Sequence, residues 1–234
     1  MDGLNYPDVV GEWETLLKVI DGKSIARYGD GEFNLVRGGN CVSQKRWPGL
    51  QTELQNILHS KDDNLLVAIP RIDPRSPKNV NWVKCCSHYG GYLKHGKTYY
   101  SAFITRPDSA PWIATPTFFD GIESLWAGKD ITMVYGSKRS LSAEFPPLAS
   151  AKSIEVVQCD YAHTYHKIGL VEQDIELRKR KTVLLMCGPS ATCLAARLSK
   201  KGFHAIDLGH IGMWWRAYDN PKLTPHLRIL NAPA

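Results

Sequence analysis

The stretch Ser24-Ile25-Ala26-Arg27-Tyr28-Gly29-Asp30-Gly31-Glu32 runs from a short apolar segment into two carboxylates separated by one glycine. The apolar part predicts a strand over residues 24–28, which places the carboxylates at its carboxyl end, where open α/β sheets bind ligands. Side chains at positions i and i+2 of an extended or turning backbone lie on the same side. We therefore expect Asp30 and Glu32 to face one hard cation together.

The glycines around Asp30 indicate which kind of ligand would bind beside this cation. Gly29 and Gly31 carry no Cβ, so a ligand can approach the main chain closely. A Mg²⁺ or Mn²⁺ held by one or two carboxylates usually completes its coordination with water and substrate phosphate oxygens. The motif predicts a metal-diphosphate site. The alternative is a tight turn before a helix from Glu32 to Arg37, whose positive N-terminus favours acidic side chains.

Further apolar runs of strand length alternate with helical patterns along the chain. Strands are expected at residues 24–28, 65–69, 98–104, 131–135, 154–158, 182–186 and 204–208. Helices are expected at residues 7–20, 50–59, 79–95, 117–127, 164–180 and 191–200. This alternation predicts an α/β fold, a single Rossmann-like domain with a mostly parallel, doubly wound sheet and helices on both faces. We assign residues 1–22 to a covering helix and residues 216–234 to a tail that wraps the surface or pairs with a second subunit in a homodimer.

A second glycine turn follows the aliphatic strand at residues 182–186. Its sequence is Cys187-Gly188-Pro189-Ser190-Ala191-Thr192, and it opens a helix. A strand, a glycine turn and a helix N-terminus together bind phosphate through free N–H groups and the helix dipole. The turn lacks the motifs of P-loops and of dinucleotide folds. Ser190 acting only as a helix N-cap is the alternative.

Cations follow two other expected strands. Gly136-Ser137-Lys138-Arg139-Ser140 has the small residues and adjacent charges of an anion nest. Arg106 follows the strand at residues 98–104 and is a candidate phosphate or sugar contact, or else a surface arginine in a proline-bounded loop.

Composition limits the function classes. The 234 residues carry a net charge of +6, which suits an anionic ligand without establishing a nucleic-acid partner. The six cysteines show no disulfide spacing, and the N-terminal sequence resembles neither a signal peptide nor a membrane anchor. We expect a cytoplasmic protein with reduced thiols and no membrane span.

Three blocks of the chain resemble the GT-D glycosyltransferase family, first met as a domain of unknown function. They are the stretch from Arg27 to Leu35, the turn from Cys187 to Thr192, and Ile206-Asp207-Leu208-Gly209-His210-Ile211, in the family's order. The resemblance implies a GT-D fold and metal-dependent sugar transfer from a nucleotide-diphosphate sugar, most commonly a UDP-sugar. Its expected cofactor is Mn²⁺ or Mg²⁺, and its expected acceptor is a glycan or glycoprotein. In the family, a glycine and basic residues also follow the strand equivalent to residues 131–135.

The motifs and the resemblance together give the candidate site. Asp30 and Glu32 are assigned to the metal, and His210 is a candidate metal ligand, diphosphate contact or base, or a core histidine at the strand end. The catalytic candidates are Asp30, Glu32 and His210, and the donor-binding candidates are Arg27, Gly29, Lys138, Gly188, Pro189, Ser190 and Thr192. Asp73, Glu144 and Asp207 are other possible bases.

Three other functions compete with this interpretation. A metal-dependent nuclease or phosphohydrolase would use the same carboxylates, but such sites gather more acidic residues around paired metals. A non-catalytic module would bind the nucleotide without turnover. The positive charge also leaves a modified DNA base as an alternative acceptor.

Overall fold

The computed structural model describes residues 5–136, 146–160, 162–212 and 215. Eight strands form one sheet in the order β1-β4-β3-β2-β8-β7-β5-β6, and every pairing between these strands is parallel. The strands are β1 (Val9–Val10), β2 (Ser24–Arg27), β3 (Leu65–Ile69), β4 (Tyr99–Ser101), β5 (Asp130–Tyr135), β6 (Ser153–Gln158), β7 (Thr182–Met186) and β8 (His204–Asp207).

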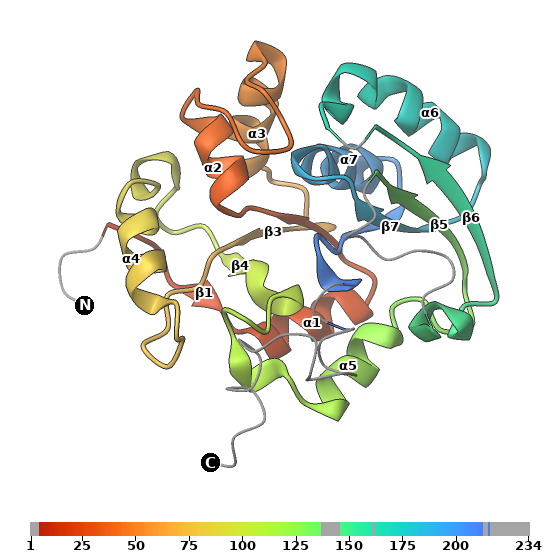
Figure 1. The fold of residues 1–234 in the computed structure, drawn as a ribbon, viewed down its shortest axis with the longest axis horizontal. Helices are drawn as coiled ribbons and strands as arrows, with labels where there is room; N and C mark the ends of the chain where they lie inside the picture. The colour runs from red at the N-terminus through yellow and green to blue at the C-terminus, as the bar shows by residue number, and fades with distance from the viewer. Residues whose placement is uncertain (1–4, 137–145, 161, 213–214, 216–234) are drawn as a thin grey trace.

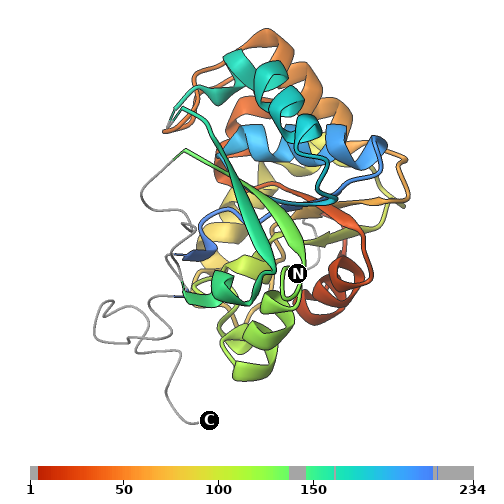
Figure 2. The same ribbon diagram turned by 90° about the vertical axis from the view of Figure 1, so that its right-hand side faces the viewer.

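Helices cover both faces of this sheet (Figures 1 and 2). Leu184 of β7 packs with α1 and α5 on one face, whereas its neighbours Val183 and Leu185 pack with α2, α3, α6 and α7 on the other. The helices are α1 (Glu12–Ile20), α2 (Asp30–Val36), α3 (Pro48–Leu58), α4 (Asn79–Ser87), α5 (Pro116–Glu123), α6 (Ile168–Leu177) and α7 (Pro189–Lys200). The predicted doubly wound α/β fold is confirmed.

The connections place a switch point in the middle of the sheet. From β2 the chain moves outward through β3 to β4, crosses to β5 and β6, and returns through β7 to β8 beside β2. The β2–β8 contact has one registered pair, Ile25 with Ile206, whereas β7 and β8 share four. Because all strands are parallel, the residues after β2, β7 and β8 meet at one edge, where open sheets of this type bind ligands.

The N-terminal helix begins later than predicted. Residues 7–20 do not form one helix, because Val9 and Val10 pair with Tyr99 and Tyr100 as the edge strand β1. Gly11 then turns the chain, and α1 starts at Glu12. The β-branched pair gains more from extending the sheet edge than from adding a helical turn.

Four other expected elements are clearly shorter than predicted. The helix at residues 117–127 ends at Glu123. The strand at residues 98–104 ends at Ser101, whose Oγ accepts a hydrogen bond from the N–H of Phe103 and starts the 3₁₀ turn η2 (Ala102–Thr105). The helix at 79–95 ends at Ser87 and is followed by η1 (Gly90–Tyr92). The helix at 164–180 is divided into η5 (Thr164–Lys167) and α6. Two further 3₁₀ turns are η3 (Pro111–Ile113) and η4 (Pro146–Ser150).

Two expectations concern regions that the structure covers only in part. The tail at residues 216–234 lies outside the described residues, and the homodimer stays a prediction. Within the described ranges, no helix combines the length and the apolar character that crossing a membrane requires.

Candidate active site

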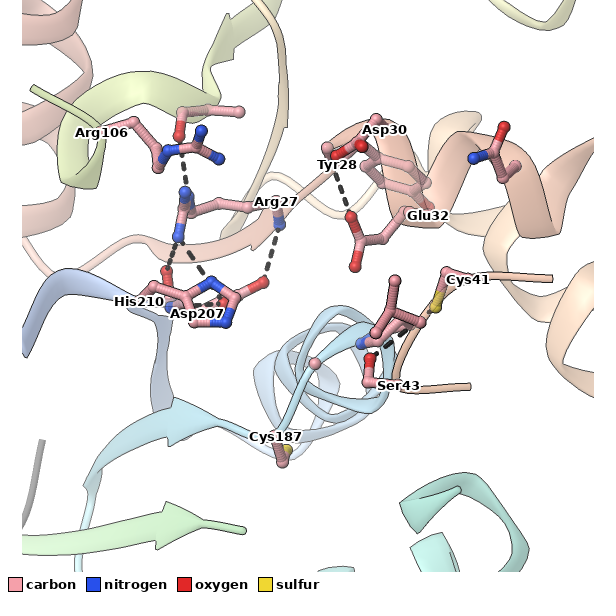
Figure 3. A pocket seen from close by; sticks show the side chains of 18 of the residues that line it. Arg27, Tyr28, Asp30, Glu32, Cys41, Ser43, Arg106, Cys187, Asp207 and His210 are labelled. Carbon is pink, nitrogen blue, oxygen red and sulfur yellow. Dashed lines mark hydrogen bonds and ion pairs between the residues drawn. The ribbon is translucent and has the colours of Figure 1, made fainter. Parts of the chain in front are cut away.

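A cavity of ≈ 430 Å³ opens at the carboxyl ends of β2, β7 and β8 (Figure 3). The cavity is lined by the segment after β2, the starts of α2 and α7, and the turn after β8, whose exposed His210 lies at the rim. The candidates from the sequence that line it are Arg27, Gly29, Asp30, Glu32, Arg106, Gly188, Pro189, Asp207 and His210. Arg27 and Asp207, which are 180 residues apart in the sequence, therefore meet at one edge of the sheet.

Arg27 ends β2 and is the central cation of this cavity. Its Nε donates to the carbonyl oxygen of Ala102 at 2.9 Å, and its Nη1 lies 3.4 Å from the carbonyl oxygen of Asp207. The side chain is 10% exposed. Burial lowers the pKa of Arg27, and the Asp207 carboxylate opposes this shift. The guanidinium is therefore a largely dehydrated positive charge, which strengthens its attraction for an anion in the cavity.

The sequence suggested that Asp30 and Glu32 lie on one side of an extended or turning backbone. The structure shows a different backbone. Asp30 is the first residue of α2, not part of an extended turn, and helical residues i and i+2 point about 200° apart. Asp30 is exposed, while Glu32 turns back so that its Oε2 accepts a 2.7 Å hydrogen bond from the Gly29 N–H (Figure 3). The helix is Asp30–Val36 and does not begin at Glu32. Both side chains still line the cavity.

Glu32 is the carboxylate with the most altered acidity. Its pKa is raised to about 7, mainly by burial; the Gly29 hydrogen bond opposes this shift, and the charges of Asp207 and Asp30 contribute to it. Asp207 behaves similarly, because burial raises its pKa to about 6 while Arg27 opposes the shift. Carboxyl groups therefore gather at this end of the cavity, where burial disfavours their ionisation. Among the described residues, no cluster of three or more His, Cys, Asp or Glu side chains forms a complete metal cage.

The start of α7 forms the wall opposite α2. Gly188 is the N-cap, with φ 60°, and Pro189 is the first helical residue; both line the cavity. Ser190 is therefore not the N-cap, and the alternative in which Ser190 only caps the helix is wrong. Ser190 and Thr192 are both buried and do not line the cavity, and Thr192 donates a 2.9 Å hydrogen bond to the Arg27 carbonyl.

Replacing Ser190 by alanine is expected to leave the free energy of unfolding unchanged or slightly higher. The Ser190 Oγ is buried and has no hydrogen-bond partner among the described residues, and such a group destabilises the fold. If Ser190 were the N-cap, this change would instead lower the free energy of unfolding by about 0.5–2 kcal/mol. Urea unfolding of the two proteins measures the difference, and a loss of 1 kcal/mol or more would contradict the assignment.

The remaining candidates occupy different places. His210 is exposed at the cavity and is not a core histidine. Arg106 lines the cavity and forms two 2.8 Å hydrogen bonds to Asp108, so it is not a simple surface arginine. Asp73 pairs with Arg75 and Arg71 away from the cavity lining. Lys138, Arg139 and Glu144 lie outside the described residues, so the anion nest is represented only by Gly136, which lines the cavity.

Comparison with known proteins places this geometry in a family. The model of the glycosyltransferase GT-D fold matches residues 25–223. The chain belongs to the GT-D glycosyltransferase family. The match includes every cavity element described above, from the end of β2 to His210.

Relatives and solved structures agree with this membership. The chain is 28% identical over 202 residues to the probable glycosyl transferase Gly of Streptococcus gordonii. The aligned region covers 81% of this chain and 30% of that protein. It is 26% identical over 221 residues to glycosyltransferase GlyD of Streptococcus pneumoniae serotype 4. Here the aligned region covers 89% of this chain and 27% of that protein. The chain thus spans less than a third of these two relatives.

The structural matches cover most of both partners. A structure described as the highly conserved domain of unknown function 1792, with a distinct glycosyltransferase fold, has a TM-score of 0.84 and 29% identity and covers 92% of this chain and 83% of its own. A glycosyltransferase of the same domain type from Streptococcus sanguinis has a TM-score of 0.81 and 26% identity, with coverages of 91% and 84%. The sheet is therefore that of a GT-D fold.

Several residues that line this cavity were not among the sequence candidates, including Gly209 and those of the loop around Val42 and Ser43. Gly209 lies in the third family block; it has a φ of 54°, and its lack of a Cβ allows the close approach of Arg27. The loop around Val42 and Ser43 forms another wall of the cavity. A 2.9 Å hydrogen bond from the His163 N–H to the Ser43 carbonyl holds this loop in place. The glycine was visible in a motif, but no local pattern indicated a contact between residues so distant in sequence.

Proposed function

We propose that the chain transfers a sugar from a nucleotide-diphosphate sugar, with UDP as the first candidate carrier, to a glycan or glycoprotein hydroxyl. Family membership supports glycosyl transfer. One observation carries the donor class: the start of α7, the buried Arg27 and the carboxylates Asp30 and Glu32 line the same cavity. A diphosphate needs both positive groups, and the carboxylates offer the hard oxygen ligands that Mg²⁺ and Mn²⁺ prefer.

The donor's diphosphate fits between α7 and Arg27. The α7 N-terminus carries partial positive charge, and the absent Cβ of Gly188 leaves room for close approach. Because the Arg27 Nε and Nη1 already bond to the carbonyls of Ala102 and Asp207, its Nη2 N–H groups are our candidates for binding phosphate oxygens. These groups are in place before reaction, so they stabilise charge developing on the leaving diphosphate with little rearrangement.

The acidic end of the cavity fits a divalent cation. The raised pKa of Glu32 and the neighbouring Asp30 and Asp207 mark a region where a positive ion would relieve repulsion. Asp30 and Glu32 would hold the ion, directly or through water, with donor phosphate oxygens completing its coordination. When bound, such a cation supplies Lewis-acid stabilisation of the departing diphosphate.

The acceptor's proton needs a separate group in an inverting reaction. His210 lies at the exposed rim of the cavity, and its imidazole is our candidate for taking that proton. The six cysteines are all free, which agrees with a reducing, cytoplasmic setting for an enzyme that uses nucleotide sugars.

Binding of UDP is expected to depend on Mn²⁺. At a UDP concentration about 100 times Kd, the free energy of unfolding should rise by about 2.7 kcal/mol with Mn²⁺ present. Chelation by EDTA should remove most of this increase. Thermal melting with UDP, UMP or no nucleotide, each with and without Mn²⁺, measures the effect. An equal rise in EDTA would exclude the metal assignment.

Turnover distinguishes the alternatives for function. Release of UDP from UDP-sugars in the presence of Mn²⁺ supports a transferase, whereas nicking of DNA supports a nuclease. Binding of UDP without release from any UDP-sugar, with glycan acceptors present, would indicate a non-catalytic module. Transfer of labelled sugar to DNA containing hydroxymethylated bases, but not to glycans, would identify the DNA alternative.

A further inference from the structure

The Arg27 backbone lies at the cavity end of the β2–β8 contact, which has the fewest registered residue pairs in the sheet. The β2–β8 contact has a single registered pair. Below it, the Ser24 Oγ donates to the Phe203 carbonyl at 3.0 Å and accepts from the Ala205 N–H at 2.9 Å. Above it, the Arg27 N–H lies 3.4 Å from Asp207 Oδ2. The cavity end of this contact therefore depends on Arg27 and Asp207.

Asp207 contacts both Arg27 and the turn that carries His210. Its Oδ1 accepts a 3.0 Å hydrogen bond from the Gly209 N–H and lies 3.9 Å from Arg27 Nη1. The residue is 5% exposed. A Cβ added to Gly209 would lie 2.5 Å from Arg27 Nη1. The guanidinium thus rests in a seat formed by the Ala102 carbonyl, Asp207 and the bare backbone of Gly209.

We propose that Asp207 and Gly209 are positioning residues, which fix the Arg27 guanidinium toward the donor diphosphate and place His210 at the rim. This inference rests on the proposed function and specifies how its donor site is built. Asp207 acts through its contacts with Arg27 and Gly209, and Gly209 acts through the space it leaves. The seat matters because a displacement of about 1 Å in a reacting complex can lower the rate about 100-fold.

The test begins with Asp207→Asn, which keeps the size of the side chain and removes its charge. We expect kcat/KM for the UDP-sugar to fall about 100-fold. The double variant Arg27→Met/Asp207→Asn should be no worse than Arg27→Met alone, because both changes remove one coupled function. If the double variant instead shows the product of the two single-variant losses in kcat/KM, the proposal is overturned. The control is Asp62→Asn, which removes another hydrogen-bonded carboxylate, near α3 and α7 and outside the cavity lining.

Gly209→Ala provides an independent test if Asp207→Asn does not fold. Its matched control is Gly202→Ala, which also has a positive φ, 75°, but open space at the Cβ position. Both variants carry similar backbone strain, and only Gly209→Ala should lower kcat/KM, again about 100-fold. Equal kinetics in the two variants would overturn the role of Gly209.

A measurement without substrate separates this inference from the proposed function. In the wild-type chain, the Arg27 Nε–H bonded to Ala102 should exchange slowly by ¹⁵N NMR, and it should exchange faster in Asp207→Asn and Gly209→Ala. Unchanged exchange in both variants overturns the seat. If the wild-type chain shows slow exchange but neither binds UDP nor releases it from UDP-sugars, the proposed function fails, and with it the catalytic meaning of the seat.

Discussion

Replacing Glu32 by glutamine is expected to lower sugar transfer by about 100-fold or more while leaving the chain folded. Glu32 lines the cavity, and its raised pKa reflects burial first, with a smaller contribution from the charges of Asp207 and Asp30. Glutamine keeps an oxygen but loses the charge that would hold Mn²⁺ or Mg²⁺. The measurement is UDP release at saturating Mn²⁺, and near-normal activity there would exclude Glu32 as a ligand.

The structural contribution of Glu32 can be separated from this loss. Its Oε2 accepts the Gly29 N–H at the start of α2, and glutamine supports the same helix-capping contact. The Glu32→Gln chain should therefore retain its circular dichroism spectrum. Asp30→Asn is the companion variant, because Asp30 is exposed and its change should reduce metal-dependent activity with little effect on folding.

Glu32→Gln should also change how the stability of the metal-free protein depends on pH. Because the folded pKa of Glu32 is raised from 4.5 to about 7, wild-type stability is lost as pH rises between these values. Glutamine cannot ionise, so the variant should gain melting temperature relative to wild type from pH 5 to pH 8. With solvent screening, about 1 kcal/mol or about 2–4 °C is expected at pH 8. A constant difference across this range would contradict the raised pKa.

The sequence predicted the central strands well because their environment leaves a strong pattern. Parallel strands covered on both faces are continuous apolar runs, and the expected bounds of the strands at 65–69 and 182–186 match β3 and β7. Shorter elements were less clear. Val9–Val10 carried the spacing of a helix, and only pairing with β4 shows that it is a strand.

The site was predictable to the level of segments, not of side-chain directions. Parallel strands bring their carboxyl ends together, so the Asp30–Glu32 turn, the Gly188 turn and His210 were expected at one edge. The helix start at Asp30 changes which way the carboxylates point, and the burial of Ser190 removes its side chain from the cavity. These differences arise from helix geometry and from packing between distant segments, which no local spacing specifies.

Gly188→Ala is expected to weaken UDP binding at least about 10-fold, because it tests the other half of the donor site. Gly188 has a φ of 60°, and an added Cβ would lie 3.0 Å from Ser43 Oγ in the cavity wall. That Cβ would occupy space beside the α7 N-terminus and strain the turn that carries it. Calorimetric titration of UDP with Mn²⁺ measures the loss.

Strain alone must be distinguished from loss of the binding surface. Gly202 follows the other end of α7 with a φ of 75°, and its Cβ would meet open space, so Gly202→Ala shares the backbone penalty of roughly 1–3 kcal/mol without altering the cavity. If the α7 N-terminus binds the diphosphate, both variants lose stability but only Gly188→Ala loses affinity, and Ser190→Ala loses neither. Equal UDP affinities in folded Gly188→Ala and Gly202→Ala would show that the turn only packs α7 against the sheet.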